Sequence, residues 1–331
     1  MGDPALVAVV VAATLGFAFT NGFHDASNSV ATTVTTRALT PRAAILLAAV
    51  MNAVGALLST ALARVVGFGL TSPPEGNAGL LLVLAGVLGA IGWNLITWWR
   101  GMPSSSSHAL IAGLAGAALF APGSLDGAAL LTLVVLPMFI SPVIGLGLGA
   151  GGTALVYRYF RERDYRETIR GFRYAQVISG AALALGHGLQ DAQKSMGVIM
   201  LALVLGGASQ ASGVTTWVVV SAAIALALGT IAGGWRVTRT LSRRITRITP
   251  ATGFVAETVS AGILGIAALA LRVPVSTTHV VASAIVGTGV YRGSYSVQWR
   301  TVLRMLFVWL ATPLAAAALA AAVRLVLLPF G

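Results

Sequence analysis

Two stretches of the chain carry an aspartate beside other polar residues inside long apolar runs. They read Gly22-Phe23-His24-Asp25-Ala26-Ser27-Asn28-Ser29 and Gly186-His187-Gly188-Leu189-Gln190-Asp191-Ala192-Gln193-Lys194. A carboxylate in apolar surroundings is costly unless it faces a cavity, an opposite charge or an ion. We therefore expect Asp25 and Asp191 to mark a functional site.

A second pair of motifs follows, each a proline before a run of hydroxyl residues and a histidine. They read Pro103-Ser104-Ser105-Ser106-Ser107-His108 and Pro274-Val275-Ser276-Thr277-Thr278-His279. Proline suits the first turn of a helix, and Ser and Thr cap the N–H groups there. The positive end of such a helix attracts anions. We predict that six hydroxyl residues surround a tetrahedral oxyanion: Ser105, Ser106, Ser107, Ser276, Thr277 and Thr278. The alternative is that these hydroxyls only cap helices or join them.

Both motifs occur in the same order in the two halves of the chain, which indicates an internal repeat. His24-Asp25 matches Gln190-Asp191, and the step from the aspartate to the later histidine is 83 residues in one half and 88 in the other. We predict a first repeat over residues 1–157 with a hairpin at 79–121. A basic cytoplasmic connector at 158–173 then leads to a second, inverted repeat over 174–331 with a hairpin at 253–290.

The composition indicates an all-α polytopic membrane protein. The chain of 331 residues is 57% hydrophobic and 9% charged, whereas soluble domains carry about 25% charged residues. Apolar runs of roughly 20 residues, the length that spans a bilayer, recur from end to end. The net charge of +12 comes from arginines in short loops, which fits cytoplasmic loops and excludes nucleic acid as the expected partner. The absence of cysteine excludes disulfide and thiolate chemistry.

The lengths of the apolar segments predict how the repeats cross the membrane. As a helix, the first segment would be about 48 Å long, more than the roughly 30 Å of a bilayer core. We therefore predict a broken helix in each repeat, the first break lying near Asn21 to Asp25. The hairpins are predicted to be re-entrant, because irregular Pro/Ser backbone at membrane depth is tolerated only around a cavity. Three crossings per repeat then place most arginines on a cytoplasmic face and both termini outside.

The charges of the predicted site require a cation. Two carboxylates in a low-dielectric site need counter-cations or protons, so Asp25 and Asp191 are predicted to bind a coupled cation. His24 is predicted to relay a proton, because histidine changes charge near neutral pH. Three polar residues, Asn28, Gln190 and Lys194, are predicted to complete the anion site. Asn28 also offers an oxygen to a cation, and Lys194 neutralises either Asp191 or the anion. No resident metal is expected.

The four motifs together resemble those of the inorganic phosphate transporter (PiT) family, over essentially the whole chain. The resemblance implies secondary transport of inorganic phosphate through inverted repeats and a homodimer. The His24-Asp25 form is similar to the bacterial low-affinity branch, which is associated with proton coupling and with metal-phosphate complexes. Sodium-coupled members carry Asn-Asp in both repeats, and Gln190-Asp191 departs from both branches.

The expected function is import of phosphate by cation symport, with a proton as the expected cation, by alternating access in a bacterial inner membrane. Sodium-coupled transport of phosphate, a sulfate permease of the same fold and a passive anion channel remain alternatives. An intramembrane hydrolase is a further alternative, since Ser, His and Asp are all present. However, no Gly-x-Ser-x-Gly elbow occurs and the serine clusters are duplicated. The sequence thus predicts a protein that is not an enzyme and needs no cofactor beyond the coupled ion.

Overall fold

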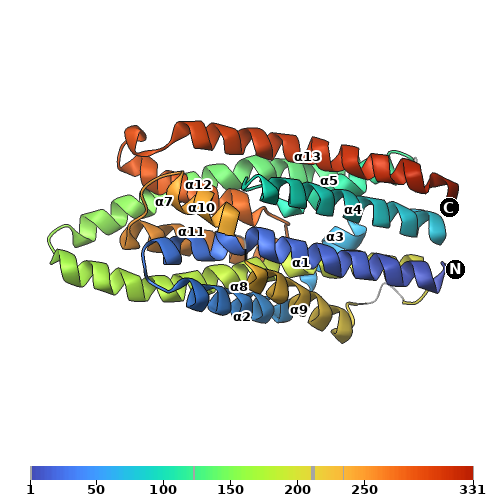
Figure 1. The fold of residues 1–331 in the computed structure, drawn as a ribbon, viewed down its shortest axis with the longest axis horizontal. Helices are drawn as coiled ribbons and strands as arrows, with labels where there is room; N and C mark the ends of the chain where they lie inside the picture. The colour runs from blue at the N-terminus through green and yellow to red at the C-terminus, as the bar shows by residue number, and fades with distance from the viewer. Residues whose placement is uncertain (1, 122–123, 210–212, 234, 331) are drawn as a thin grey trace.

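The computed structural model describes residues 2–121, 124–209, 213–233 and 235–330, and these are helical almost throughout. The long helices run roughly along one axis of an elongated bundle (Figure 1). Outside the helices, the described backbone pairs in strand fashion only at two isolated bridges, Thr71 with Leu125 and Thr246 with Val297. The predicted all-α fold class is confirmed.

The helices fall into two successive sets of similar order. The first set contains α1 (Pro4–Thr35), α2 (Pro41–Leu58), α3 (Ala61–Phe68), α4 (Asn77–Trp99), α5 (Ser106–Ala118), α6 (Gly127–Leu130) and α7 (Leu136–Phe160). The second set contains α8 (Tyr165–Leu205), α9 (Thr216–Ala232), α10 (Trp235–Arg243), α11 (Pro250–Ile266), α12 (Thr277–Tyr291) and α13 (Trp299–Leu327). Short π-helical turns, Leu131–Val135 and Ala267–Leu271, join α6 to α7 and extend α11.

Helix starts follow the capping residues of the sequence. Thr40 precedes Pro41 and its hydroxyl accepts a hydrogen bond from the N–H of Ala43 at 3.3 Å. At the start of α11, Thr249 and Thr252 form a reciprocal capping box around Pro250. Such side chains satisfy N–H groups that lack partners within the helix, and proline at the first position loses no hydrogen bond.

The predicted break in each long helix is wrong. Helix α1 is a single helix of 32 residues through Asn21 and Asp25, and α8 is a single helix of 41 residues through Asp191. The backbone has no need to open, because side chains of the hairpin tips supply partners to the polar groups, as described below. The excess length instead carries both helices beyond the span of a roughly 30 Å hydrocarbon core.

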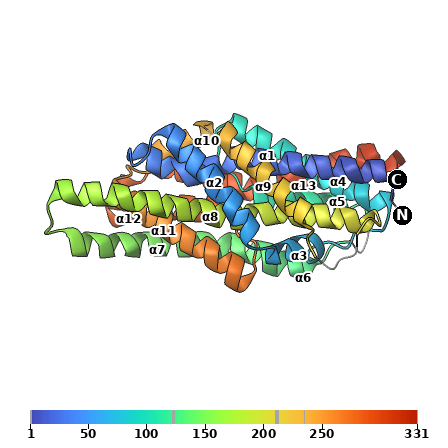
Figure 2. The same ribbon diagram turned by 90° about the horizontal axis from the view of Figure 1, so that it is seen from below.

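Two helical hairpins reach the middle of the bundle from opposite ends. Helices α4 and α5 extend from their tip toward the end where α1 begins, whereas α11 and α12 extend toward the turn between α7 and α8 (Figures 1 and 2). Helix α5 has 13 residues and α12 has 15, so each is only about 20 Å long at 1.5 Å per residue and is too short to cross a bilayer. The hairpins begin at Asn77 and Pro250, slightly earlier than predicted.

The two tips leave their first arm through the same unusual backbone conformation. Gly101 has φ 64° and Arg272 has φ 55°, both in the left-handed region. Each lies two residues before the proline of its motif, Pro103 or Pro274. Glycine adopts this conformation freely, whereas an L-residue such as arginine adopts it at a cost of about 1–2 kcal/mol.

The first helix of each set packs closely on the second helix of the other set. A Cβ on Gly22 of α1 would lie 2.3 Å from the carbonyl oxygen of Leu226 in α9. A Cβ on Gly188 of α8 would lie 2.1 Å from the carbonyl oxygen of Asn52 in α2. Gly22 and Gly188 each precede the aspartate of their helix by three residues. The two close contacts therefore hold α1 and α8 at equivalent positions relative to Asp25 and Asp191.

Among the described residues, six helices are long and apolar enough to cross a membrane: Pro4–Thr35, Pro41–Leu58, Asn77–Trp99, Leu136–Phe160, Pro250–Leu271 and Trp299–Phe330. This set includes the long arms of both hairpins, so length and composition do not separate a re-entrant arm from a crossing helix. The first helix begins and the last helical turn ends at the same end of the bundle (Figure 1).

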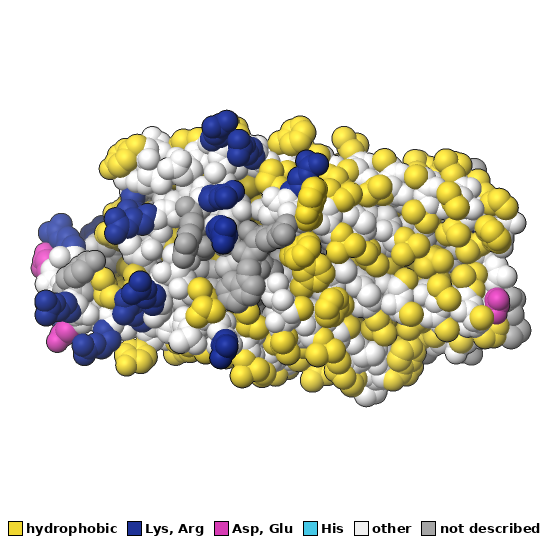
Figure 3. Space-filling view, viewed as in Figure 1, with side chains coloured by type: hydrophobic (Ala, Val, Ile, Leu, Met, Phe, Trp, Pro, Cys, Tyr) yellow, Lys and Arg dark blue, Asp and Glu magenta, His cyan; other side chains and the backbone are white. Residues whose placement is uncertain are grey.

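Basic side chains gather toward the opposite end, and apolar side chains cover most of the rest of the face in view (Figure 3). Within the predicted connector 158–173, only residues 161–164 lie outside α7 and α8. Asp164 starts α8 early, because its carboxylate accepts hydrogen bonds from the N–H groups of Arg166 and Glu167 at 2.9 and 3.0 Å. The basic segment 236–247 likewise contains most of α10.

Candidate functional site

All twelve side chains that the sequence singles out are buried where the two hairpin tips meet α1 and α8, and none is more than 3% exposed. The set comprises His24, Asp25, Asn28, Ser105, Ser106, Ser107, Gln190, Asp191, Lys194, Ser276, Thr277 and Thr278. Residues more than 250 positions apart in the chain are therefore in one cluster. In this conformation the cluster is closed toward both ends of the bundle.

Asp25 receives hydroxyl groups from both hairpins. The hydroxyl of Ser106 donates to Oδ2, and the hydroxyl of Thr278 donates to Oδ1 at 3.2 Å. The neighbouring His24 places Nδ1 2.8 Å from Oδ1. The other ring nitrogen of His24 lies 3.2 Å from the Thr97 hydroxyl and 3.3 Å from the Ser104 hydroxyl. His24 therefore connects Asp25 to a hydrogen-bonded chain of hydroxyls in the first hairpin.

Two amides flank Asp25 on α1 at positions i−4 and i+3. The amide nitrogen of Asn28 donates to the Thr278 hydroxyl at 2.9 Å. The amide oxygens of Asn21 and Asn28 are both buried and have no hydrogen-bond partner among the described residues. An unpaired buried acceptor costs about 1–3 kcal/mol. A ligand that carries positive charge or donates a proton in a hydrogen bond would therefore stabilise these oxygens.

Asp191 lies among nitrogen atoms instead. Lys194 Nζ contacts Asp191 Oδ1, and His187 Nε2 lies 2.8 Å from Oδ2. The Thr277 hydroxyl donates to Oδ2 at 3.4 Å. Lys194 also donates to the Ser107 hydroxyl and to the carbonyl oxygen of Val275, the latter at 3.5 Å. The removal of one partner from such a buried ion pair costs about 3–5 kcal/mol, because the other charge stays buried.

The three hydroxyl residues of each tip have three different tasks, and corresponding residues share a task. The first, Ser105 or Ser276, caps its helix by accepting the N–H of the histidine three residues later, at 3.2 Å in both cases. The second, Ser106 or Thr277, donates to the aspartate of its own half. The third, Ser107 or Thr278, contacts the long helix of the other half.

His187 is a site residue that the sequence prediction did not include. One ligand atom each from Asp25, His187 and Asp191 lies within 4.8 Å of the others, a group that could hold a cation. His187 Nδ1 lies 3.0 Å from the amide oxygen of Asn52, which can only accept, so Nδ1 carries a hydrogen. Nε2 then faces the Asp191 carboxylate and needs a proton or a cation between them. The available sequence signal was the i, i+4 spacing of His187 and Asp191.

Gln190, the residue that matches His24, bonds to backbone groups. Its amide nitrogen donates to the carbonyl oxygens of Leu264 and Val273, both at 3.4 Å, and its oxygen accepts the N–H of Val275 at 3.4 Å. These bonds hold the second hairpin tip against α8. The prediction that Gln190 binds the anion stays untested, and its contacts here are those of a positioning residue.

The two tips also touch each other. The rings of His108 and His279 lie 4.9 Å apart, centre to centre, at 62°. His279 stacks on Trp309 of α13 at 4.0 Å, and the Trp309 indole donates to the carbonyl oxygen of Pro103 at 3.1 Å. Helix α13 therefore braces the contact between the tips.

A separate polar cluster surrounds Glu257 of α11. Its carboxylate accepts hydrogen bonds from Thr32 and Ser179 at 2.5 Å and from Gln176 at 3.1 Å. These partners come from α1 and α8, so Glu257 joins the second hairpin to the two long helices. In the first hairpin, the polar residue Asn94 of α4 is likewise buried.

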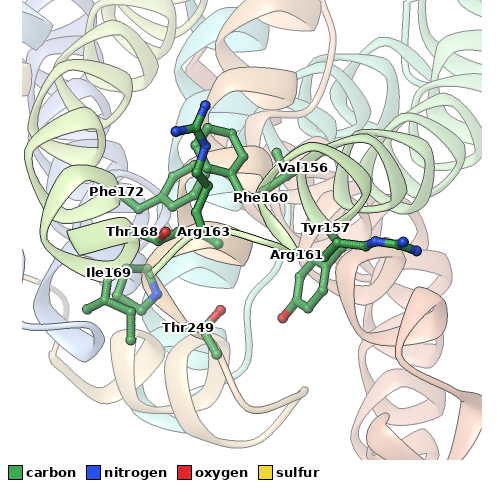
Figure 4. Close-up of a pocket in the computed structure, with 11 residues that line it drawn as sticks. Val156, Tyr157, Phe160, Arg161, Arg163, Thr168, Ile169, Phe172 and Thr249 are labelled. Carbon is green, nitrogen blue, oxygen red and sulfur yellow. The ribbon is translucent and has the colours of Figure 1, made fainter. Parts of the chain in front are cut away.

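A cavity of about 410 Å³ lies away from this cluster, beside the turn between α7 and α8. Aromatic and arginine side chains line it, among them Phe160, Phe172 and Arg163 (Figure 4). The cavity shares no residue with the central cluster. The residues that the sequence singles out therefore lie outside this cavity, in the cluster between the hairpin tips.

Comparisons with known proteins agree with this arrangement. A model of the phosphate transporter family matches residues 21–170 and again 160–320. A probable low-affinity inorganic phosphate transporter of Mycobacterium tuberculosis (strain CDC 1551 / Oshkosh) is 44% identical over 315 residues, which is 94% of this chain and 75% of that protein. The protein of the same description from Bacillus subtilis (strain 168) is 40% identical over 310 residues, 93% of this chain and 92% of its own.

A solved structure described as the sodium-dependent phosphate transporter has the same fold. It superposes with a TM-score of 0.84 over 98% of this chain and 99% of its own, at 22% identity. The family model and the relatives together cover nearly the whole sequence, including both aspartate motifs and both hairpin tips. The chain belongs to the phosphate transporter family.

Proposed function

We propose that this protein imports inorganic phosphate by symport with a cation, and that the cation is a proton. The family and the descriptions of the relatives support the substrate. The observation that supports a coupled cation is the cluster of Asp25, His187 and Asp191. Their ligand atoms lie within 4.8 Å of one another, and hydroxyls of both tips donate to Asp25. A phosphate dianion approaches two buried carboxylates only if positive charge enters with it.

The proposed anion site is the set of second and third hydroxyls of the tips, Ser106, Ser107, Thr277 and Thr278. They are neutral donors from two directions, suited to the oxygens of a tetrahedral anion. Ser106 and Thr278 now donate to Asp25, and Thr277 donates to Asp191, whereas Ser107 accepts from Lys194. In this proposal the hydroxyls turn toward phosphate when it binds. Ser105 and Ser276 act as helix caps in this proposal.

The proposed route of the coupled proton passes through His24 and Asp25. His24 bridges the Asp25 carboxylate and the hydroxyls of Thr97 and Ser104, an unbroken hydrogen-bonded chain. Histidine changes charge near neutral pH and so suits a relay. Oxygen ligands at Asn21 and Asn28 also suit sodium, which is the second candidate for the coupled cation.

The proposed mechanism is alternating access between two inverted repeats, residues 1–157 and 174–331. The equivalent tasks of the tip hydroxyls and the entry of the hairpins from opposite ends (Figures 1 and 2) support this division. Withdrawal of one hairpin tip at a time would open the buried cluster to one side only.

The proposed location is a bacterial plasma membrane, with the basic end of the bundle in the cytoplasm and both termini outside. The distribution of arginines in Figure 3 supports this orientation. We further propose that the protein functions as a homodimer and accepts phosphate free or as a metal complex.

The test is uptake of labelled phosphate by the purified protein in proteoliposomes. We expect accumulation driven by an inward proton gradient without sodium, and weak competition by sulfate. Uptake that requires sodium and does not depend on the pH gradient would identify sodium, and not a proton, as the coupled cation. Equilibration without accumulation would indicate a passive channel, and strong competition by sulfate would indicate a sulfate permease.

A further inference from the structure

We infer that the Lys194 ammonium is a tethered substitute for one of two coupled cations, so that the exchangeable cation binds at the Asp25 half of the site alone. This inference rests on the proposed function and assigns different roles to its two aspartates. The residues four positions before and three positions after each aspartate differ between the two halves.

The Asp191 half already contains its own positive charge. Lys194 is fully buried, and its three donors match three oxygen acceptors: Asp191 Oδ1, the Ser107 hydroxyl and the Val275 carbonyl. A carboxylate, a hydroxyl and a backbone carbonyl form the kind of oxygen set that binds a monovalent cation in transporters with discontinuous helices. The ammonium therefore occupies a cation position and has no donor left for the anion.

The Asp25 half has the same framework with amides in place of the cationic groups. Asn28 corresponds to Lys194, and its nitrogen donates to Thr278 just as Lys194 donates to the corresponding Ser107. Asn21 corresponds to His187. These asparagines lie about one helical turn before and after Asp25, and the amide oxygens of both are buried without a hydrogen-bond partner among the described residues. This half-site presents unmatched oxygens, which a cation from solution can satisfy.

The charges of the two halves lead to a specific expectation for coupling. Lys194 pairs with Asp191 on the same helix, so Asp191 is neutralised without an exchangeable cation, and the proton between Asp191 and His187 stays in place. Asp25 is neutralised only when a proton or another monovalent cation binds. Lys194 therefore lowers by one the number of cations that must enter with each phosphate.

The decisive variant is Lys194→Asn, which gives the second half the residue of the first. In proteoliposomes, the charge moved per phosphate is obtained from the membrane potential at which net labelled-phosphate flux reverses. We expect this ratio to rise by one in Lys194→Asn and to stay at the wild-type value in Lys194→Arg, which keeps the charge. An unchanged ratio in Lys194→Asn would overturn the inference.

The reciprocal variant Asn28→Lys places an ammonium beside Asp25, and there the ratio should fall by one. If Lys194→Asn does not transport, equilibrium binding of sodium-22 and proton uptake at constant pH are measured on the purified protein. One additional cation bound relative to wild type supports the inference, and equal numbers overturn it. Failure of the wild-type protein to transport phosphate would instead refute the proposed function, so the two failures are distinguishable.

Discussion

The two halves of the site share a scaffold but not a charge distribution. Around Asp25, the flanking positions of the helix carry Asn21 and Asn28, whose amide oxygens have no partner in the part of the chain that the structure describes. Around Asp191, the same positions carry His187 and Lys194, both of which contact the carboxylate. The tip hydroxyls nevertheless perform matching tasks in both halves. We therefore propose that one duplicated framework holds an exchangeable cation on one side and a permanent one on the other.

Among substitutions that test the difference between the two halves, Asp25→Asn has the largest expected effect on transport. Loss of the charge that attracts the exchangeable cation should cost at least about 3 kcal/mol, and about 1.4 kcal/mol corresponds to a factor of ten. We expect accumulation of labelled phosphate in proteoliposomes to fall by about 100-fold or more. Full retained accumulation would remove Asp25 from the mechanism.

A matched control for this variant is Glu162→Gln, which also replaces a carboxylate by an amide. Glu162 is 80% exposed and pairs with Arg161 on the surface. Exposed pairs contribute about 0–1 kcal/mol, so uptake by Glu162→Gln should match the wild type. A similar loss in both variants would point to a general effect on the protein instead of the site.

A smaller effect separates the hydroxyls that face the ligand from those that cap helices. Ser106→Ala removes a hydrogen bond to a charged group, worth about 1.5–3 kcal/mol, and should weaken phosphate binding by about 10- to 100-fold. Ser105→Ala removes a cap and should lower the free energy of unfolding by about 1 kcal/mol with little change in affinity. Phosphate binding by calorimetry and thermal unfolding check the pair; the reverse pattern would exchange their roles.

The smallest effect tests whether the scaffold is equal in both halves. Gly22→Ala and Gly188→Ala should each lower the free energy of unfolding by about 1–3 kcal/mol, because the new methyl group overlaps a backbone carbonyl. Gly16→Ala is the control, since a Cβ there meets no atom within 4 Å. Alanine should stabilise that helix position by about 0.5–1 kcal/mol. Thermal unfolding in detergent gives all three values, and a large difference between Gly22→Ala and Gly188→Ala would refute an equal scaffold.

The sequence contained enough information to predict which polar residues cluster but not the contacts within the cluster. The motifs around Asp25, Asp191 and the two tips could be predicted because polar residues are rare in apolar helices. Helix continuity through Asp25 could not, because the hydroxyls that satisfy its carboxylate come from distant segments, among them Thr278. The different hydrogen-bond partners of Ser105 and Ser106 could not be predicted for the same reason, since side-chain direction at a helix start follows from tertiary packing.

The role of His187 was missed for a related reason. Its spacing from Asp191 was visible, but the Asn52 contact that turns Nε2 toward the carboxylate joins helices 135 positions apart. The match of Lys194 with Asn28 was visible as well, whereas the saturation of its three donors by oxygen acceptors required the assembled fold.

The most direct test of cation coupling at Asp25 is simultaneous measurement of proton and labelled-phosphate entry into sodium-free proteoliposomes. Coupling at Asp25 predicts that proton entry accompanies phosphate at a fixed ratio in the wild-type protein and that both fall together by about 100-fold or more in Asp25→Asn. Phosphate accumulation without proton entry, or unchanged entry of both in Asp25→Asn, would contradict it.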